Sequence, residues 1–306
     1  MIRFGTWPAR GAWLLLPLLA GPVLAEALDT TSRPVQVVAS LGLWGGWLGG
    51  LLATLVPRTV TLTLLRLTAS AGVACVVVAA GAMAGGAGDG ASSSASDGGS
   101  STVWRLVGLV SVLVTAGVVF APATGRLFVD GSSYGDEQRF PLRVPAPLLA
   151  GPVPLAWVAV VAGVSAGPLL LAARMWVVGA VALVVGGLAA RWGVRALHVL
   201  ARRWVVMVPA GLVLHDPLAL GEPILLRREQ VQGLDPAPVD TAALDLTRGA
   251  LGLALELRLA APVEMTVAAG PSGPTAEHEA VKAASVLFTP TQPGALLAAA
   301  RARRIG

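Results

Sequence analysis

The chain has 306 residues, of which 55% are hydrophobic and only 13% are charged, and its formal net charge is +5. Soluble domains carry about 25% charged residues, so this composition argues against an ordinary soluble protein and favours a membrane protein. The arginines lie at the ends of apolar runs and not in one basic patch, so we expect no nucleic-acid partner.

Six apolar segments predict membrane-spanning helices. A bilayer core about 30 Å thick requires roughly 20 apolar residues in helical form. Backbone groups find no water inside lipid, so a helix is the structure expected for runs of this length. The predicted spans are residues 11–28, 35–56, 60–82, 103–121, 153–172 and 175–191.

The first segment allows two interpretations. Arg3 and Arg10 precede an apolar run, and the sequence Ala25-Glu26-Ala27 resembles a signal-peptidase site, as in a secretory signal peptide. A retained membrane helix has the same composition, and we favour it because another apolar segment follows almost immediately. Both interpretations leave residue 29 outside the cytoplasm, so the expected orientation of the remaining chain is the same.

The arginines in the connecting segments predict the orientation. Cytoplasmic connections of membrane proteins carry an excess of Arg and Lys. Arg33, Arg105 and Arg174 lie near one side of the predicted bundle. Ten arginines lie near the other side, and they are Arg3, Arg10, Arg58, Arg126, Arg139, Arg143, Arg191, Arg195, Arg202 and Arg203. We therefore predict a bacterial cytoplasmic (inner) membrane protein with both termini in the cytoplasm.

Glycines at helical spacing predict close helix packing. Gly42, Gly46 and Gly50 recur every four residues in the second span, and Gly163 and Gly167 form a shorter stripe in the fifth. Small residues let another helix approach closely, and this packing stabilises association in lipid. The sequence leaves open whether the neighbouring helix belongs to the same chain or to a second copy, so a homo-oligomer is one possible partner.

The connector 130–145 is the densest charged segment of the first two-thirds of the chain. Its candidate contact residues are Tyr134, Asp136, Glu137, Arg139 and Arg143. Adjacent carboxylates point in different directions on a strand or a helix, so Asp136 and Glu137 form a poor catalytic pair. We interpret the connector as a cytoplasmic contact site that docks the C-terminal domain or a partner.

The residues after Arg203 predict a cytoplasmic α+β domain. Strands are expected in 204–216, as a hairpin around Pro209-Ala210-Gly211, and in 223–235, 241–246, 252–260 and 263–269. Leucines alternate with other residues in 252–260, which is typical of a half-buried strand. A turn-rich connector, 270–280, and a C-terminal helix from about Gln292 follow. The predicted domains are therefore a transmembrane helical domain, 1–203, and an antiparallel α+β domain, 204–306.

This order of strands closed by one helix is similar to the bacterial pleckstrin-homology-like (PH-like) domain. The segments "RRWVVMVPAGLVLHD", "ILLRREQVQGLD" and "LFTPTQPGALLAAARARR" carry the resemblance. Eukaryotic pleckstrin-homology domains often bind phosphoinositides through a basic first hairpin loop, which Pro209-Ala210-Gly211 lacks. Arg227 and Arg228 are the alternative candidates for contact with anionic lipid. The whole chain also resembles uncharacterised multi-span membrane proteins of actinobacteria.

These features predict a scaffold or regulator and not an enzyme. Cys75 is the only cysteine, the three histidines are scattered, and no nucleophile motif is present, so we predict no catalytic residue, cofactor or metal site. The expected partners are membrane lipids and a protein at the cytoplasmic face, bound at an exposed strand edge or beside the C-terminal helix. The alternative function is a lipid or small-solute transporter that the cytoplasmic domain gates.

Overall fold

The computed structural model describes residues 6–86, 95–269 and 277–305. The chain forms two compact units, and each is built from two separate parts of the sequence. The first comprises Met1–Leu127 and Leu155–Arg195, and the second comprises Phe128–Pro154 and Ala196–Gly306. The second unit therefore contains the connector 130–145 in addition to the C-terminal region.

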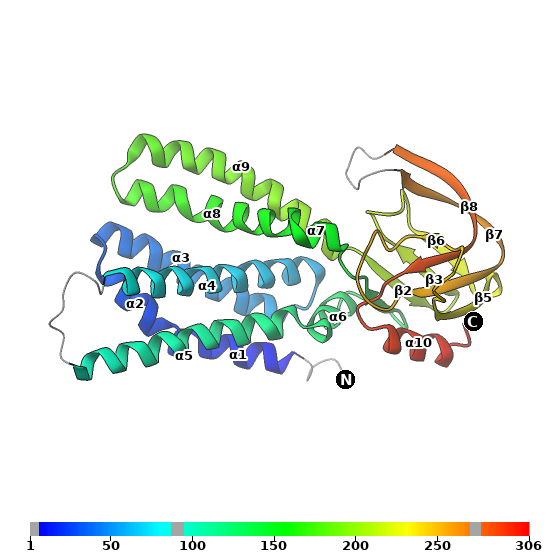
Figure 1. The fold of residues 1–306 in the computed structure, drawn as a ribbon, viewed down its shortest axis with the longest axis horizontal. Helices are drawn as coiled ribbons and strands as arrows, with labels where there is room; N and C mark the ends of the chain where they lie inside the picture. The colour runs from blue at the N-terminus through cyan, green and yellow to red at the C-terminus, as the bar shows by residue number, and fades with distance from the viewer. Residues whose placement is uncertain (1–5, 87–94, 270–276, 306) are drawn as a thin grey trace. The chain divides into compact units, whose positions relative to one another are not determined.

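The first unit is helical (Figure 1). Its helices are α1 (Trp7–Leu19), α2 (Gly21–Asp29), α3 (Arg33–Leu55), α4 (Thr59–Gly86), α5 (Ala95–Phe120), α8 (Pro152–Ala172) and α9 (Trp176–Ala201). Among the described residues, six helical segments are long and apolar enough to cross a membrane, with α1 and α2 counted as one segment. They coincide with the six predicted segments, but α9 continues for ten residues beyond the predicted end at 191.

Two tryptophans join α1 to α3. The indole Nε1 of Trp13 donates to the carbonyl oxygen of Trp47 at 2.8 Å, and Nε1 of Trp47 donates back to the carbonyl oxygen of Trp13 at 3.0 Å. The Trp13 ring is buried and lies against Gly50, where a Cβ atom would come within 2.8 Å of three ring atoms. Gly50 therefore provides the space that the indole occupies.

Helices α8 and α9 pack through glycines. Their backbones meet at Gly163 and Gly186, and a Cβ on Gly167 would lie 2.6 Å from the Cα of Leu183. The predicted stripe of Gly163 and Gly167 thus lies at a close helix crossing within one chain. Figure 1 shows the two helices side by side.

The second unit contains two four-stranded sheets. The first has the order β1 (Gln138–Pro141), β2 (Trp204–Val208), β3 (Gly211–His215) and β4 (Ile224–Arg227), with every pair antiparallel. The predicted hairpin around Pro209-Ala210-Gly211 is confirmed as β2 and β3. β1 comes from the connector and joins the edge of β2, with Phe140 buried in the core.

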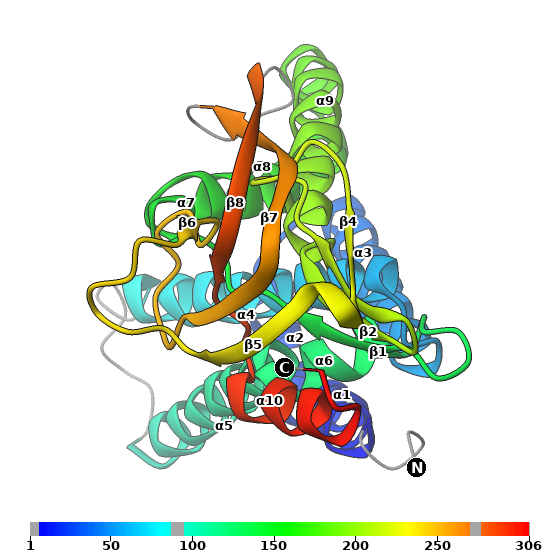
Figure 2. The ribbon, with the colours of Figure 1, turned by 90° about the vertical axis from the view of Figure 1, so that its right-hand side faces the viewer.

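The second sheet has the order β5 (Val231–Pro236), β7 (Leu255–Ala269), β8 (Glu277–Phe288) and β6 (Leu244–Asp245). Figure 2 shows β7 and β8 running side by side as long curved strands. Buried side chains of both sheets and of the C-terminal helix α10 (Pro293–Ala302) share one hydrophobic core. The unit is completed by the end of α6 (Pro122–Asp130), α7 (Ala146–Ala150) and a 3-10 turn, Arg228–Gln230.

Four details differ from the expected strand pattern. The segment 223–235, expected as strand, forms β4 and β5, which belong to different sheets. The segments 252–260 and 263–269 form one strand, β7, whose register shifts between Arg258 and Val263. Strand β6 is parallel to β8, so the domain is not wholly antiparallel. Strand β8 begins at Glu277, inside the predicted turn region 270–280; residues 270–276 lie outside the described part of the chain.

Candidate partner-binding groove

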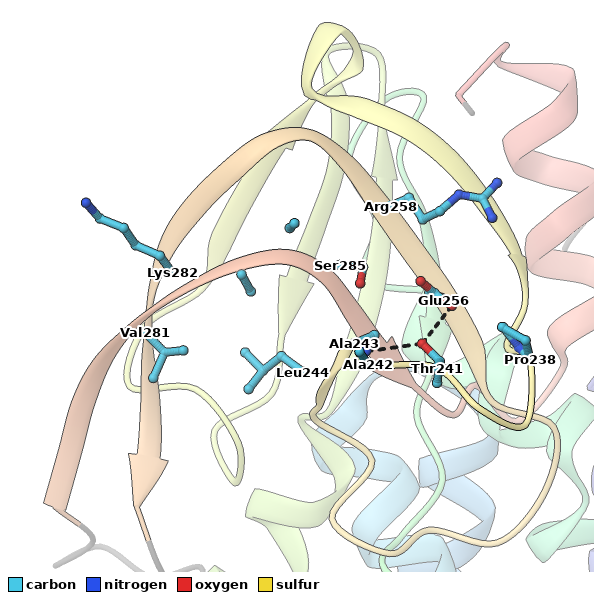
Figure 3. Close-up of a pocket in the computed structure, with 12 residues that line it drawn as sticks. Pro238, Thr241, Ala242, Ala243, Leu244, Glu256, Arg258, Val281, Lys282 and Ser285 are labelled. Carbon is cyan, nitrogen blue, oxygen red and sulfur yellow. Dashed lines mark hydrogen bonds between the residues drawn. The ribbon is translucent and has the colours of Figure 1, made fainter.

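A groove of about 620 Å³ lies in the second sheet of the second unit (Figure 3). Strand β8 contributes Val281–Ser285 to its lining, and Thr241–Leu244, the segment before β6 together with the first residue of β6, line it as well. The groove forms because β6 pairs with β8 only at Val286 and Leu287, so the chain that leads into β6 diverges from the neighbouring part of β8. Small and apolar side chains make up much of the surface.

A buried hydrogen bond fixes one wall of the groove. Glu256 on β7 is only 8% exposed, and its Oε2 accepts a hydrogen bond from the Thr241 hydroxyl at 2.9 Å. The same hydroxyl oxygen accepts from the backbone N–H of Ala243 at 3.1 Å. These bonds, drawn as dashed lines in Figure 3, hold the segment that leads into β6. Glu256 therefore supports this wall of the groove.

Two cations lie at the rim of the groove. The Arg258 guanidinium is 2.7 Å from a carboxylate oxygen of Asp235, and both side chains are about half exposed. An exposed pair of this kind contributes about 0–1 kcal/mol, so Arg258 remains available to a partner. Lys282 is exposed, and Figure 3 shows its side chain extending away from the other lining residues.

Strand β8 presents an open edge along the groove. Within the described residues, the edge of β8 opposite β7 pairs only with β6, which leaves Glu277–Ser285 without a strand partner there. The Leu287 carbonyl points to this edge, because it accepts from the N–H of Leu246 at 3.0 Å. Backbone groups alternate between the two edges of a strand, so Ser285 turns its N–H and C=O groups to the same side as Leu287. A row of unpaired backbone groups is a template for another strand.

A buried ion pair holds the connector to the first sheet. Nε and Nη2 of Arg203 donate to the two carboxylate oxygens of Asp216 at 2.7 and 2.6 Å, and both side chains are 1% exposed. Nη1 of Arg203 donates to the backbone oxygen of Arg143 at 2.6 Å. The charges have specific partners, which is what burial of an ion pair requires. The pair is structural, because both groups are fully used and closed to solvent.

Three side chains stack across the first sheet beside this pair. The rings of Trp204 and His215 are 5.0 Å apart, and the Arg139 guanidinium lies 5.6 Å from the centre of the Trp204 ring. Burial lowers the pKa of His215, Arg202 lowers this pKa further, Asp216 opposes the change and Arg139 adds to it. His215 Nε2 is buried and has no hydrogen-bond partner among the described residues. The arrangement therefore favours a neutral imidazole.

The predicted contact residues do not line the groove. Tyr134 is 87% exposed, the Asp136 carbonyl accepts a hydrogen bond from Arg303, and Glu137 lies 3.4 Å from Arg139. These residues lie beside or within β1. Arg143, which follows β1, is exposed and lies against Gly252.

The other predicted residues lie at separate places. Arg227 ends β4, at the opposite edge of the first sheet from β1, and Arg228 donates to the Pro209 carbonyl at 3.0 Å. In the first unit, Gly50 contacts Trp13, whereas added Cβ atoms on Gly42 and Gly46 would meet no atom within 4 Å.

The sequence did not predict the groove, because the first part of β8 lacks the residues typical of a strand. Its first residues, "EHEAVKAA", are rich in Glu, Lys and Ala, which are depleted in strands. The pairing with β7 overrides this local preference. Among the described residues, no group of three or more His, Cys, Asp or Glu side chains is placed to hold a metal ion. No protein-family model matches the chain, and the searches of curated proteins and of solved structures found no match either.

Proposed function

We propose that this chain is a multi-pass protein of the bacterial inner membrane that gathers a protein partner at the cytoplasmic face through a PH-like domain, without catalysis. The six long apolar helices support the membrane assignment. Two four-stranded sheets with a C-terminal helix support the PH-like assignment, from which the parallel strand β6 is a departure.

The pairing of β1 with β2 supports the predicted membrane topology, and this support does not depend on the distribution of arginines. β1 precedes α8 in the chain, β2 follows α9, and the two strands pair with each other. If α8 and α9 cross the bilayer, the chain must therefore cross an even number of times between the strands, which two spans satisfy. The excess of arginine in the same connections supports the cytoplasm as that side.

The open edge of β8 beside the groove is the observation that carries the proposed function. An extended peptide that pairs with Val281–Ser285 satisfies the free backbone groups and places its side chains in the groove. This mode of recognition takes affinity from main-chain hydrogen bonds and specificity from the pockets for alternate side chains. In the groove, Glu256 is buried and already bonded to Thr241, which favours a peptide over a ligand that needs several convergent polar groups.

The test uses the full-length chain in native membranes, because β1 lies outside a 204–306 fragment. A photoreactive amino acid in place of Lys282 is expected to give one discrete protein adduct. Ala284→Glu places a charge and extra volume in the groove and is expected to lower the adduct yield about tenfold, equivalent to roughly 1.4 kcal/mol of binding free energy. Ala210→Glu is the matched control, since Ala210 is an exposed alanine in the β2–β3 turn and does not line the groove.

Two results would contradict the proposal. One is the absence of a discrete adduct from Lys282 in membranes in which the protein is folded. The other is an adduct whose yield falls equally in the Ala284→Glu and Ala210→Glu chains, because that pattern indicates a general effect of charge and not occupancy of the groove.

A further inference from the structure

The turn from Thr247 to Leu253 exposes leucines on a well-defined backbone. Leu251 is 70% exposed and Leu253 is 50% exposed. The N–H of Ala250 donates to the carbonyl of Thr247 at 3.0 Å, and the N–H of Thr247 donates to the Asp245 carboxylate at 2.7 Å. Single exposed apolar residues are common on protein surfaces, whereas a large contiguous apolar patch marks a contact with a partner or a membrane.

This turn is attached to the segment that leads into α8. The N–H of Ala146, the first residue of α7, donates to the carbonyl of Gly249 at 3.2 Å. A Cβ on Gly252 would lie 2.9 Å from Nε of Arg143, so the Arg143 side chain crosses the turn directly over this glycine. Gly252 has φ of +120°, which also favours glycine.

Helix α7 adds a third exposed leucine beside the point where α8 begins. Leu149 is 50% exposed, and only Gly151 separates the end of α7 from the first residue of α8, Pro152. Because α8 is one of the six helices suited to cross a membrane, the hydrogen bond from α7 keeps the turn within a short distance of the bilayer surface.

We propose that the turn 247–253 is a membrane anchor of the second unit. Leu251, Leu253 and Leu149 enter the boundary between lipid headgroups and acyl chains, while Arg143 binds lipid phosphate. This inference rests on the proposed placement of α8 in the membrane. Apolar side chains beside a cation are the pattern that binds interfaces. The direct continuity with α8 favours lipid over a protein as the occupant.

The test measures the depth of the turn in lipid. Cys75 is the only cysteine, so in a Cys75→Ser background Leu251→Cys carries a single environment-sensitive fluorophore on the full-length chain in phospholipid nanodiscs. Quenchers attached high on the acyl chains are expected to quench position 251 about threefold more strongly than position 225. Leu225→Cys is the matched control, because Leu225 is an exposed leucine (47%) on β4 of the same unit.

Arg143→Gln tests the phosphate contact. In nanodiscs that contain phosphatidylglycerol, this substitution is expected to reduce the quenching at position 251 toward the level seen with phosphatidylcholine alone, because an anionic surface attracts the arginine. Equal quenching of both chains in both lipids would overturn the role of Arg143. Inorganic phosphate, added at the same concentration as the phosphatidylglycerol, should leave the quenching unchanged, because the ligand is a lipid headgroup.

A label at Leu183→Cys in α9 separates the anchor from the membrane assignment. Leu183 is 46% exposed within a helix suited to span a membrane. Strong lipid quenching at 183 with a water-exposed label at 251 would overturn the anchor alone. A label at 251 that is shielded from water but not quenched by lipid would indicate a protein contact and would also overturn it. Absence of lipid quenching at both 183 and 251 would refute the membrane placement itself.

Discussion

The contact between Gly50 and Trp13 gives a sharp prediction for the helical unit. In Gly50→Ala the new methyl group overlaps the buried indole, which must move and lose at least one of its reciprocal hydrogen bonds with Trp47. Overpacking of a core costs about 1–3 kcal/mol and a lost hydrogen bond about 1 kcal/mol. Alanine returns up to about 1 kcal/mol through its higher helix propensity.

The expected net loss is about 2 kcal/mol, which lowers the Tm by about 4–8 °C for a unit of about 150–250 residues, the size range of the helical unit. Thermal unfolding of the purified full-length protein in mild detergent, followed by tryptophan fluorescence, measures this shift. Gly46→Ala is the matched control, because a Cβ on Gly46 meets no atom of the chain within 4 Å, and its Tm should equal or exceed that of the original chain.

A Gly50→Ala protein that melts at the original temperature would refute the reasoning, because it would show that the Trp13 ring does not occupy the space over Gly50. A lowered Tm for Gly46→Ala would instead indicate that a second copy packs on the exposed part of the glycine stripe. That packing would form the homo-oligomer that the sequence allows.

Three further predictions concern the second unit. Asp216→Ala leaves the buried Arg203 guanidinium without its carboxylate and should cost about 3–5 kcal/mol in urea unfolding; a loss below about 1 kcal/mol would show that water reaches the site. The pKa of His215 is lower in the folded chain than in the unfolded chain, so the unfolded chain binds more protons. The stability that neutral His215 contributes to the fold is therefore present above the unfolded pKa of about 6.5 and is lost as pH falls through the folded pKa. His215→Phe should flatten the fall in Tm below about pH 6.5, and an unchanged pH profile would assign the effect to other groups. Phe140→Ala should cost about 3–5 kcal/mol because Phe140 is 1% exposed, whereas Tyr134→Ala on the same connector should stay within about 0.5 kcal/mol; equal effects would show that β1 does not belong to the core.

The sequence predicted the long helices well, because twenty consecutive apolar residues have few other stable structures. It also located the β2–β3 hairpin, where Pro209-Ala210-Gly211 separates two runs rich in Val and Leu. The predicted end of the last membrane span, residue 191, lies before the end of α9 at Ala201, because Arg191 and Arg195 continue the helix and arginine is a good helix former.

Most of the candidate site could not be predicted from the sequence, and the causes are physical. Strand β1 has a single fully buried side chain, Phe140, among charged neighbours, so its pairing with β2 depends on a strand about sixty residues later. Strand β8 has poor local strand preference. The groove arises from the divergence of two chain segments, and no local pattern encodes such a shape. The charged residues around 134–143 predicted a contact region, and the contacts that the structure shows there lie within the fold of the second unit.

The division of the first sheet between two parts of the chain sets an order of events during synthesis. β1 leaves the ribosome before α8 and α9 are made, and its partner β2 follows about sixty residues later. At roughly 5–20 residues per second, β1 waits about 3–12 s before it can pair. During this interval Phe140 has no core to enter. The first sheet can close only after α8 and α9 have brought the chain back to the side of the membrane on which β1 lies.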